Sequence, residues 1–135
     1  MADKVSFELV SPARLLLSED VDMVVIPGAE GDFGVLPMHS PLVSSIRPGV
    51  INVYDGNDIT QRIFVAGGFA EVTPEGCTVL AEEAIAVGDI DRAAAERDLS
   101  GLRDDLKDAG DGVEAAPIER RIAVAEAKIA ATEAG

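Results

Sequence analysis

The composition of this chain changes sharply near Gly88, and this change constrains the fold more than any other feature. Residues 1–88 hold six of the seven prolines, nine of the 13 glycines, all five aromatic residues and 22 of the 29 valine, isoleucine and threonine residues. β-Branched and aromatic residues favour strands, and glycine and proline favour tight turns. Residues 89–135 hold 12 of the 20 alanines, and alanine loses no side-chain entropy in a helix. The sequence therefore predicts an all-β domain over 1–88 and a helical domain over 89–135.

Short alternating segments between turn residues predict the strands of the first domain. Val5, Phe7 and Leu9 alternate with polar neighbours before a Ser-Pro pair. Further strands are expected at 22–26, 41–46, 50–54, 60–66, 69–73 and 77–81. Turn sequences at 55–58 and 74–76 join two pairs of these strands into hairpins. Closely spaced strands without intervening helices indicate a β-sandwich of roughly ten short strands, or a flattened barrel.

Two glycine-rich segments interrupt this pattern. Residues 28–34, Gly-Ala-Glu-Gly-Asp-Phe-Gly, lack the Gly-Lys-Ser/Thr ending of a phosphate-binding loop and lead into Pro37 rather than a helix. We interpret them as a wide turn in which several glycines take a positive φ. Gly67-Gly68 stands inside an apolar run, and it predicts a bulge or a close backbone approach.

Apolar residues recur at steps of four and three in two segments of the second domain. The first seam is Ala95, Leu99, Leu102, Leu106 and Ala109, and the second is Ile118, Ile122, Ala125, Ile129 and Thr132. Asp89 or Asp91 is a candidate N-cap of the first helix, and Pro117 falls in the first turn of the second. Because a Gly-Asp-Gly sequence at 110–112 separates the seams, we expect an antiparallel α-helical hairpin with a narrow, alanine-rich contact.

The chain is strongly acidic, with 11 basic and 25 acidic residues among 135 and a net charge of −14. This charge argues strongly against a nucleic-acid partner, because binding a phosphate backbone needs a basic footprint. Adhesion to anionic lipid is disfavoured for the same reason. A single cysteine favours a reducing compartment. No run reaches the roughly 18 apolar residues of a membrane helix, and the first residues carry no apolar export signal.

Candidate catalytic groups are few. His39 is the only histidine, and only Ser40 stands beside it as a possible nucleophile. Cys77 lies in an expected strand, which favours a packed core thiol over a reactive one. The aspartates at 104, 105, 108 and 111 miss the spacing of a calcium-binding loop. The sequence therefore predicts no catalytic residue, no metal site and no cofactor.

Four segments, in order, resemble one known family. Residues 25–42 read Val-Ile-Pro-Gly-Ala-Glu-Gly-Asp-Phe-Gly-Val-Leu-Pro-Met-His-Ser-Pro-Leu, and they are followed by Ile46-Arg47-Pro48-Gly49, by Val-Ala-Gly-Gly-Phe-Ala-Glu-Val at 65–72 and by Val-Leu-Ala-Glu at 79–82. These segments are similar to the hallmark segments of the epsilon subunit of F-type ATP synthase. That family combines a β-sandwich with a helical hairpin, so the resemblance covers the whole chain.

The resemblance implies a non-catalytic subunit of the central stalk that helps couple proton flow to ATP synthesis. In this family one face of the sandwich grips the gamma subunit, and one end touches the polar loops of the membrane c-ring. The alpha and beta subunits of the catalytic head are further partners. The expected location is peripheral, on the cytoplasmic face of a bacterial inner membrane or an equivalent membrane, and it is reached only through the complex. The interface with the c-ring and gamma is carried over onto Glu30, Gly31, Asp32, Pro37, His39, Ser40 and Pro41.

Some members of this family bind ATP on the hairpin through the pattern Ile/Leu-Asp-x-x-Arg-Ala. Ile90, Asp91 and Ala95 fit this pattern, but Ala94 stands where arginine is expected. Arg92 lies two residues earlier, about 200° away around a helix. Residues 89–135 also carry 7 basic and 12 acidic residues, which weakens any attraction to an acidic surface of the head. We therefore expect little direct ATP sensing and, at most, modest inhibition of ATP hydrolysis by the hairpin.

Two other classes of protein remain as alternatives. A β-sandwich ligand-binding module needs a concave site with aromatic platforms, and five aromatic residues spread over 88 residues do not indicate one. A small hydrolase needs a nucleophile paired with a base, and the sequence shows no such pair.

Overall fold

The computed structural model describes residues 4–109 and 115–133. The chain divides into two compact units, Met1–Ala86 and Val87–Gly135, two residues before the boundary that composition predicts. The first unit is formed by β1 (Val5–Val10), β2 (Leu15–Val21), β3 (Met23–Gly28), β4 (Gly31–Val35), β5 (Leu42–Ile46), β6 (Gly49–Asp55), β7 (Asp58–Val65), β8 (Gly68–Val72), β9 (Gly76–Ala81) and β10 (Ala84–Ala86). The second is formed by the short 3-10 helix η1 (Val87–Asp89), α1 (Arg92–Ala109) and α2 (Ala115–Glu133). The predicted β-sandwich followed by two helices is confirmed.

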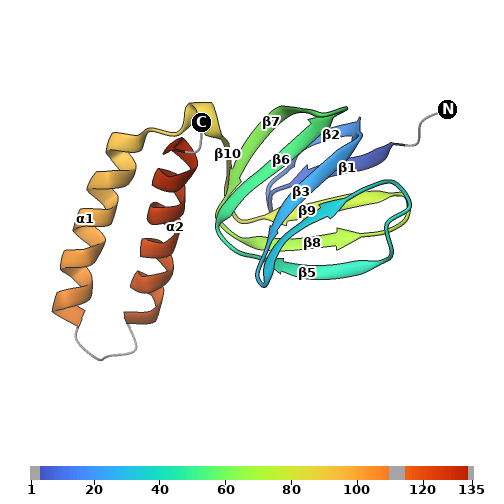
Figure 1. Cartoon of the computed structure of the whole chain (residues 1–135). Helices are drawn as coiled ribbons and strands as arrows, with labels where there is room; N and C mark the ends of the chain where they lie inside the picture. The colour runs from blue at the N-terminus through green and yellow to red at the C-terminus, as the bar shows by residue number, and fades with distance from the viewer. Residues whose placement is uncertain (1–3, 110–114, 134–135) are drawn as a thin grey trace. The chain divides into compact units, whose positions relative to one another are not determined.

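The strands of the first unit form one hydrogen-bonded path that folds into two layers (Figure 1). One layer contains β10, β7, β6 and β3, with β4 beside β3, and the other contains β5, β8, β9, β1 and β2. The layers join where Gly28 of β3 pairs with Ile46 of β5. Neighbouring strands run antiparallel except for β1 and β9, which are parallel.

Alternate residues of β1, β6, β8 and β9 fill the space between the layers. Val5, Phe7 and Leu9 of β1 are buried, as their alternation predicts. Ala70 and Val72 of β8 and Cys77, Val79 and Ala81 of β9 face the same core. Burial raises the pKa of the Cys77 thiol to about 12, so this thiol stays protonated at neutral pH. The prediction of a packed core thiol is confirmed.

The interpretation of residues 28–34 as a wide turn is wrong. β3 and β4 pair from Val24 with Val35 down to Gly28 with Gly31, so the turn consists of two residues, Ala29 and Glu30. Gly31 is the one residue of this segment with a positive φ, at 141°. β4 carries little apolar surface of its own and is held by pairing with β3 and by Val35 and Phe33, which pack on the core. The sequence pattern misses β4 because these are tertiary contacts, and it misses β2 and β10 as separate strands.

Gly67, between β7 and β8, and Gly68, the first residue of β8, have φ of 141° and 137°. A Cβ atom on Gly68 would lie 1.9 Å from the carbonyl oxygen of Leu80. Gly68 pairs with Ile46 of β5 on one side and with Ala81 of β9 on the other. The predicted close backbone approach is therefore confirmed, and it lies between two paired strands of one layer.

The helices of the second unit pack against each other. Asp91 caps α1, because its Oδ1 accepts a hydrogen bond of 3.0 Å from the Ala94 amide; Asp89 lies in η1 instead. Ala95 and Leu99 of α1 and Ala125 and Ala131 of α2 are buried, and the other seam residues are partly exposed. The predicted narrow, alanine-rich contact is confirmed, with Ala131 added. The Gly-Asp-Gly break at 110–112 lies outside the described residues.

A small polar cluster joins the start of β1 to the β6–β7 turn. Asp22, between β2 and β3, accepts a hydrogen bond of 2.5 Å from Lys4 Nζ and another of 2.5 Å from the Gly56 amide. Asp55 lies 3.9 Å from the same lysine nitrogen. The hydrogen bond from Lys4, followed by that from Gly56, lowers the pKa of Asp22 from 3.8 to about 2. The folded state therefore favours the ionised carboxylate.

An Asp22→Asn variant should lose stability in a pH-dependent way. Because folding lowers the pKa of Asp22, its contribution is fully present above about pH 4 and is lost as the pH falls toward 2. The difference in midpoint temperature between the native protein and the variant should be largest at pH 6 and should shrink to a small fraction of that value by pH 2. Thermal unfolding followed by circular dichroism measures this difference, and a gap that stays constant over this range contradicts the assignment.

Candidate functional site: the tip, the turn and the outer face of the sandwich

The turn between β3 and β4 forms an acidic tip of the sandwich. Glu30 and Gly31 are exposed there, and Asp32 follows as the next residue of β4. Arg47, directly after β5, donates to Asp32 Oδ1 at 2.5 Å and to the Gly28 carbonyl at 2.5 Å. Its own amide donates to the Pro27 carbonyl at 3.0 Å. Arg47 therefore fixes the tip against the end of β5.

The segment between β4 and β5 contains the other predicted interface residues. Pro37 and His39 are partly exposed, and Ser40 and Pro41 are exposed. The His39 amide donates to the Leu36 carbonyl at 3.2 Å, which closes a tight turn over 36–39. The Met38 amide donates to the Pro74 carbonyl at 3.1 Å and fastens this turn to the β8–β9 turn. The His39 ring has its Nδ1 2.7 Å from the Ser40 carbonyl oxygen, so Nδ1 acts as the donor.

The seven predicted interface residues therefore fall into two groups rather than one cluster. Glu30, Gly31 and Asp32 lie near the end of β5, because Gly28 pairs with Ile46. The segment 37–41 precedes the start of the same strand. Five residues in an extended conformation separate the two groups, a distance of roughly 15 Å. A single small ligand does not span both groups, whereas a protein surface does.

Sequence reasoning misses a row of apolar side chains on the outer face of the β5–β2 layer. Register pairs place Leu15 beside Val10, Val10 beside Leu80, and Leu80 beside Phe69. Phe69 and Leu80 are 56% and 47% exposed, and Leu15 is 54% exposed. Val43 of β5, 69% exposed, lies diagonally from Phe69: it pairs with the exposed Glu71 and stands two residues from Ser45, the register partner of Phe69. We call Leu15, Val10, Leu80, Phe69 and Val43 the apolar row.

A solvated sheet face normally carries polar residues, and a contiguous exposed apolar patch marks an interaction site. In the other layer, the positions that face away from the core combine polar Asn52 and Arg62 with Val50 and Phe64, and Phe64 is fully buried, so no apolar row is exposed at these positions. In the sequence, the apolar row shows only as consecutive apolar residues within a strand, such as Val79-Leu80, whose side chains face opposite sides of the sheet. That pattern is equally typical of a strand buried on both faces, so the sequence alone does not separate the two cases.

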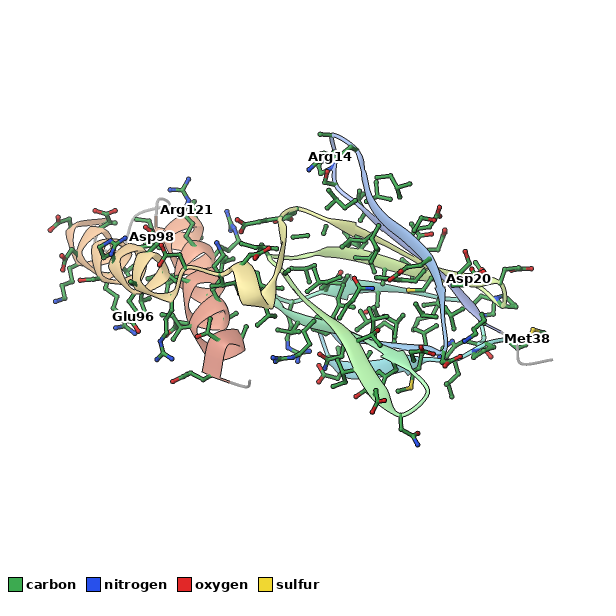
Figure 2. The ribbon with its side chains drawn as sticks, turned by 90° about the horizontal axis from the view of Figure 1, so that it is seen from above. Arg14, Asp20, Met38, Glu96, Asp98 and Arg121 are labelled. Atoms are coloured by element: carbon green, nitrogen blue, oxygen red, sulfur yellow. The ribbon has the colours of Figure 1, made fainter. Side chains whose placement is uncertain are left out.

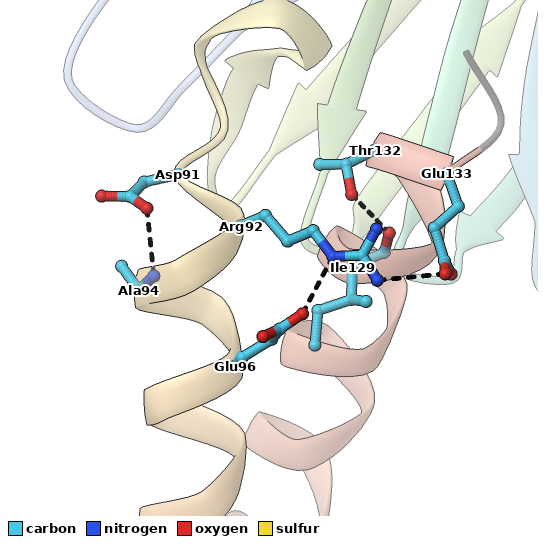
Figure 3. Close-up of polar contacts among 7 residues, drawn as sticks. All are labelled: Asp91, Arg92, Ala94, Glu96, Ile129, Thr132 and Glu133. Atoms are coloured by element: carbon cyan, nitrogen blue, oxygen red, sulfur yellow. Dashed lines mark hydrogen bonds and ion pairs between the residues drawn. The ribbon is translucent and has the colours of Figure 1, made fainter.

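At the start of α1, Asp91 and Ala94 of the family nucleotide pattern are hydrogen-bonded to each other, and the neighbouring Arg92 is bonded to α2 (Figure 3). Arg92 donates to Glu96 Oε1 at 2.9 Å on its own helix and to Glu133 Oε2 at 3.1 Å on α2. Asp91 is occupied as the cap, and Ala94 contributes the capped amide. The one arginine at this place is thus already bound by two carboxylates, and the surroundings are acidic.

The described residues offer no centre for bond chemistry. No group of three or more histidine, cysteine, aspartate or glutamate side chains among them could hold a metal ion. The Cys77 thiol is buried, and His39 is bonded to a backbone carbonyl rather than to a nucleophile. Within residues 4–109 and 115–133, neither α1 nor α2 is apolar enough over its length to cross a membrane.

Comparisons with known proteins agree with this fold. The family model of the β-sandwich domain of the ATP synthase delta/epsilon chain matches residues 4–87, and that of the C-terminal domain of the ATP synthase epsilon chain matches residues 91–135. The ATP synthase epsilon chain of Paramagnetospirillum magneticum is 53% identical over 131 residues, covering 97% of this chain and 98% of the relative. That of Rhodospirillum centenum is 54% identical over 134 residues, covering 96% and 92%.

Solved structures show the same architecture. One subunit of the Euglena gracilis mitochondrial ATP synthase, in a structure of its OSCP/F1/c-ring, matches with a TM-score of 0.84 at 23% identity, covering 97% of this chain and 82% of that one. One subunit of the Tetrahymena thermophila central stalk and c-ring matches with a TM-score of 0.65 at 12% identity, covering 97% and 98%. The chain belongs to the ATP synthase epsilon chain family. It is a non-catalytic subunit of that complex, and the comparisons give no support to the ligand-binding module.

Proposed function

We propose that this chain joins the gamma subunit to the c-ring in the rotor of a proton-translocating ATP synthase and helps couple rotation to ATP synthesis in the alpha–beta head. The observation that carries the proposal is the apolar row, which spans β5, β8, β9, β1 and β2 on one face of the sandwich. This face offers gamma a surface that gains stability when water is removed from it. Its rigidity comes from hydrogen-bonded strands that are packed on their inner side.

The tip at 29–32 is proposed to meet the polar loops of the c-ring. Its exposed groups are the carboxylates of Glu30 and Asp32, which suit hydrogen-bond donors and cations. Arg47 holds Asp32 and the Gly28 carbonyl at once, so a force on the tip passes into β5. His39, Ser40 and Pro41 are proposed to lie against gamma, because they lead directly into the strand that carries Val43. The subunit would then be peripheral to the cytoplasmic face of a bacterial inner membrane, or of an equivalent membrane, through the complex.

Reconstitution tests this function. ATP synthase stripped of its epsilon subunit is returned to vesicles with and without this chain, and ATP-driven proton uptake is measured beside ATP hydrolysis. The chain should restore proton uptake per ATP hydrolysed without acting as a catalyst itself. Proton uptake that is equal with and without the chain, while the chain is bound, contradicts a coupling role.

The hairpin is proposed to sense ATP weakly and to inhibit hydrolysis modestly. Arg92 is bound by Glu96 and Glu133, so a phosphate contact from it would first have to displace both carboxylates. Calorimetry on the whole subunit should show no ATP binding tighter than about millimolar, a level worth only about 4 kcal/mol. Removing residues 89–135 should raise hydrolysis by the head less than severalfold. Micromolar ATP binding, or a tenfold rise, contradicts this reading of the charges.

A further inference from the structure

The turn at 36–39 has the pattern of a type II β-turn with an unfavourable residue at its third position. Pro37 occupies the second position, which proline favours, and the His39 amide donates to the Leu36 carbonyl across the turn. The third position of this turn type requires a positive φ and normally holds glycine or asparagine. Here it is Met38, with φ of 66°.

Met38 stands apart in two independent ways. Among the described residues it is the one non-glycine residue with a positive φ. It is also the most exposed of the large hydrophobic side chains in that part of the protein, at 71%. Figure 2 shows it at the end of the sandwich, with its side chain directed outward. In the free subunit both properties are unfavourable. A left-handed φ strains a residue that has a Cβ atom, and an apolar side chain left in water lacks the stabilisation that its burial would give.

The surrounding structure keeps Met38 in this conformation. The hydrogen bond from its amide to Pro74 ties it to the β8–β9 turn, and the bond from His39 to Leu36 closes the turn around it. A non-glycine residue held in a strained conformation by its surroundings is typical of a contact site. Methionine is also a side chain that adapts to irregular apolar surfaces.

We propose that Met38 is an anchor for gamma that destabilises the free subunit and stabilises the complex. This inference rests on the proposed function. The turn is fastened to the β8–β9 turn and leads into β5, which carries Val43 of the apolar row. Phe69 and Leu80 of the row lie toward the other end of the β8–β9 hairpin. The exposed side chains of the turn at 36–39, Leu36 and Met38, are apolar, which fits gamma on that row rather than the polar loops of the c-ring.

Three substitutions separate strain from contact. Met38→Gly removes both the strain and the side chain, Met38→Ala keeps the strain and removes the side chain, and Met38→Leu keeps both. The midpoint temperature of Met38→Gly should exceed that of Met38→Ala by about 4–8 °C in the sandwich transition. Affinity for the soluble alpha–beta–gamma head lacking epsilon should fall about tenfold for both Met38→Gly and Met38→Ala, and Met38→Leu should stay within about threefold of the native protein.

Each outcome decides between proposals. If the native protein does not bind the head, the proposed function fails. If the native protein binds and Met38→Gly binds equally well, only the anchor role fails. The same titration is repeated with complete ATP synthase stripped of epsilon, which includes the c-ring; if Met38→Gly loses affinity there but not for the soluble head, the anchor meets the ring, and the assignment to gamma is wrong. If Met38→Gly is no more stable than Met38→Ala, the turn is not strained and the proposal is overturned.

Discussion

A Phe69→Glu variant should fold normally and bind the alpha–beta–gamma head at least about 100-fold more weakly than the native protein. The burial of a phenylalanine side chain stabilises by roughly 1.5–3 kcal/mol, and a carboxylate in its place must lose its hydration against an apolar surface. Phe69 is more than half exposed on the outer face of β8, so the substitution leaves the core unchanged. Binding is measured by titrating labelled subunit with head that lacks epsilon.

Two matched variants show whether the effect belongs to the apolar row. Leu80→Glu, at the register partner of Phe69, should lose affinity to a similar degree. Ile59→Glu replaces an equally apolar, 45% exposed side chain on β7, outside the row, and it should bind like the native protein. Circular dichroism and thermal unfolding confirm that all three variants fold. If Ile59→Glu loses as much affinity as Phe69→Glu, the effect is one of charge, and the row is not the docking surface.

A Gly68→Ala variant should destabilise the sandwich by about 2–5 kcal/mol, which lowers its midpoint temperature by roughly 10 °C or more. The added Cβ atom would lie 1.9 Å from the Leu80 carbonyl oxygen, and φ at this position is 137°. Relief would require β8 and β9 to separate, and these strands pair from Gly68 to Val72. Urea and thermal unfolding, followed by far-ultraviolet circular dichroism, measure the loss.

Gly31→Ala is the matched control for this change. Gly31 has nearly the same φ, 141°, but a Cβ atom there would meet nothing within 4 Å. The Gly31→Ala variant should therefore lose only the free energy of unfolding that backbone strain costs, about 1–3 kcal/mol. The difference between the two variants isolates the clash with Leu80. Equal destabilisation by both variants shows that the backbone shifts freely at Gly68, against the interpretation of a close approach.

The regular parts of the fold follow from local patterns. Val5, Phe7 and Leu9 alternate and are buried, and the Asp91 cap begins α1 where the apolar seam begins. These features depend on side-chain periodicity and on hydrogen bonds within one turn of helix, which a sequence shows directly. β4 escapes the sequence pattern because its pairing with β3 and the packing of Val35 depend on residues that give no local signal.

The candidate site is predictable from the sequence only in part. The resemblance points to Glu30, Asp32 and His39. Glu30 lies in the β3–β4 turn, Asp32 near the start of β4, and His39 between β4 and β5. Their division into a tip and a separate turn is decided by the register of β3 against β5. The role of Arg47 in holding Asp32 also appears only when two loops meet in space. Neither a spacing nor a composition signal contains that information.

By itself, the sequence of this protein determined an all-β domain, a helical hairpin and the family to which both belong, because strand and helix periodicities and glycine-shaped turns are local properties. The tertiary structure alone decided which apolar residues remain outside the core. Val10, Phe69 and Leu80 resemble core residues in the sequence, yet strand pairing places them in one outward row. The same structure holds Met38 in a glycine conformation through a bond to Pro74. The physical reason is that a side chain's face is set by its strand's partners and register, which are contacts between residues far apart in the sequence.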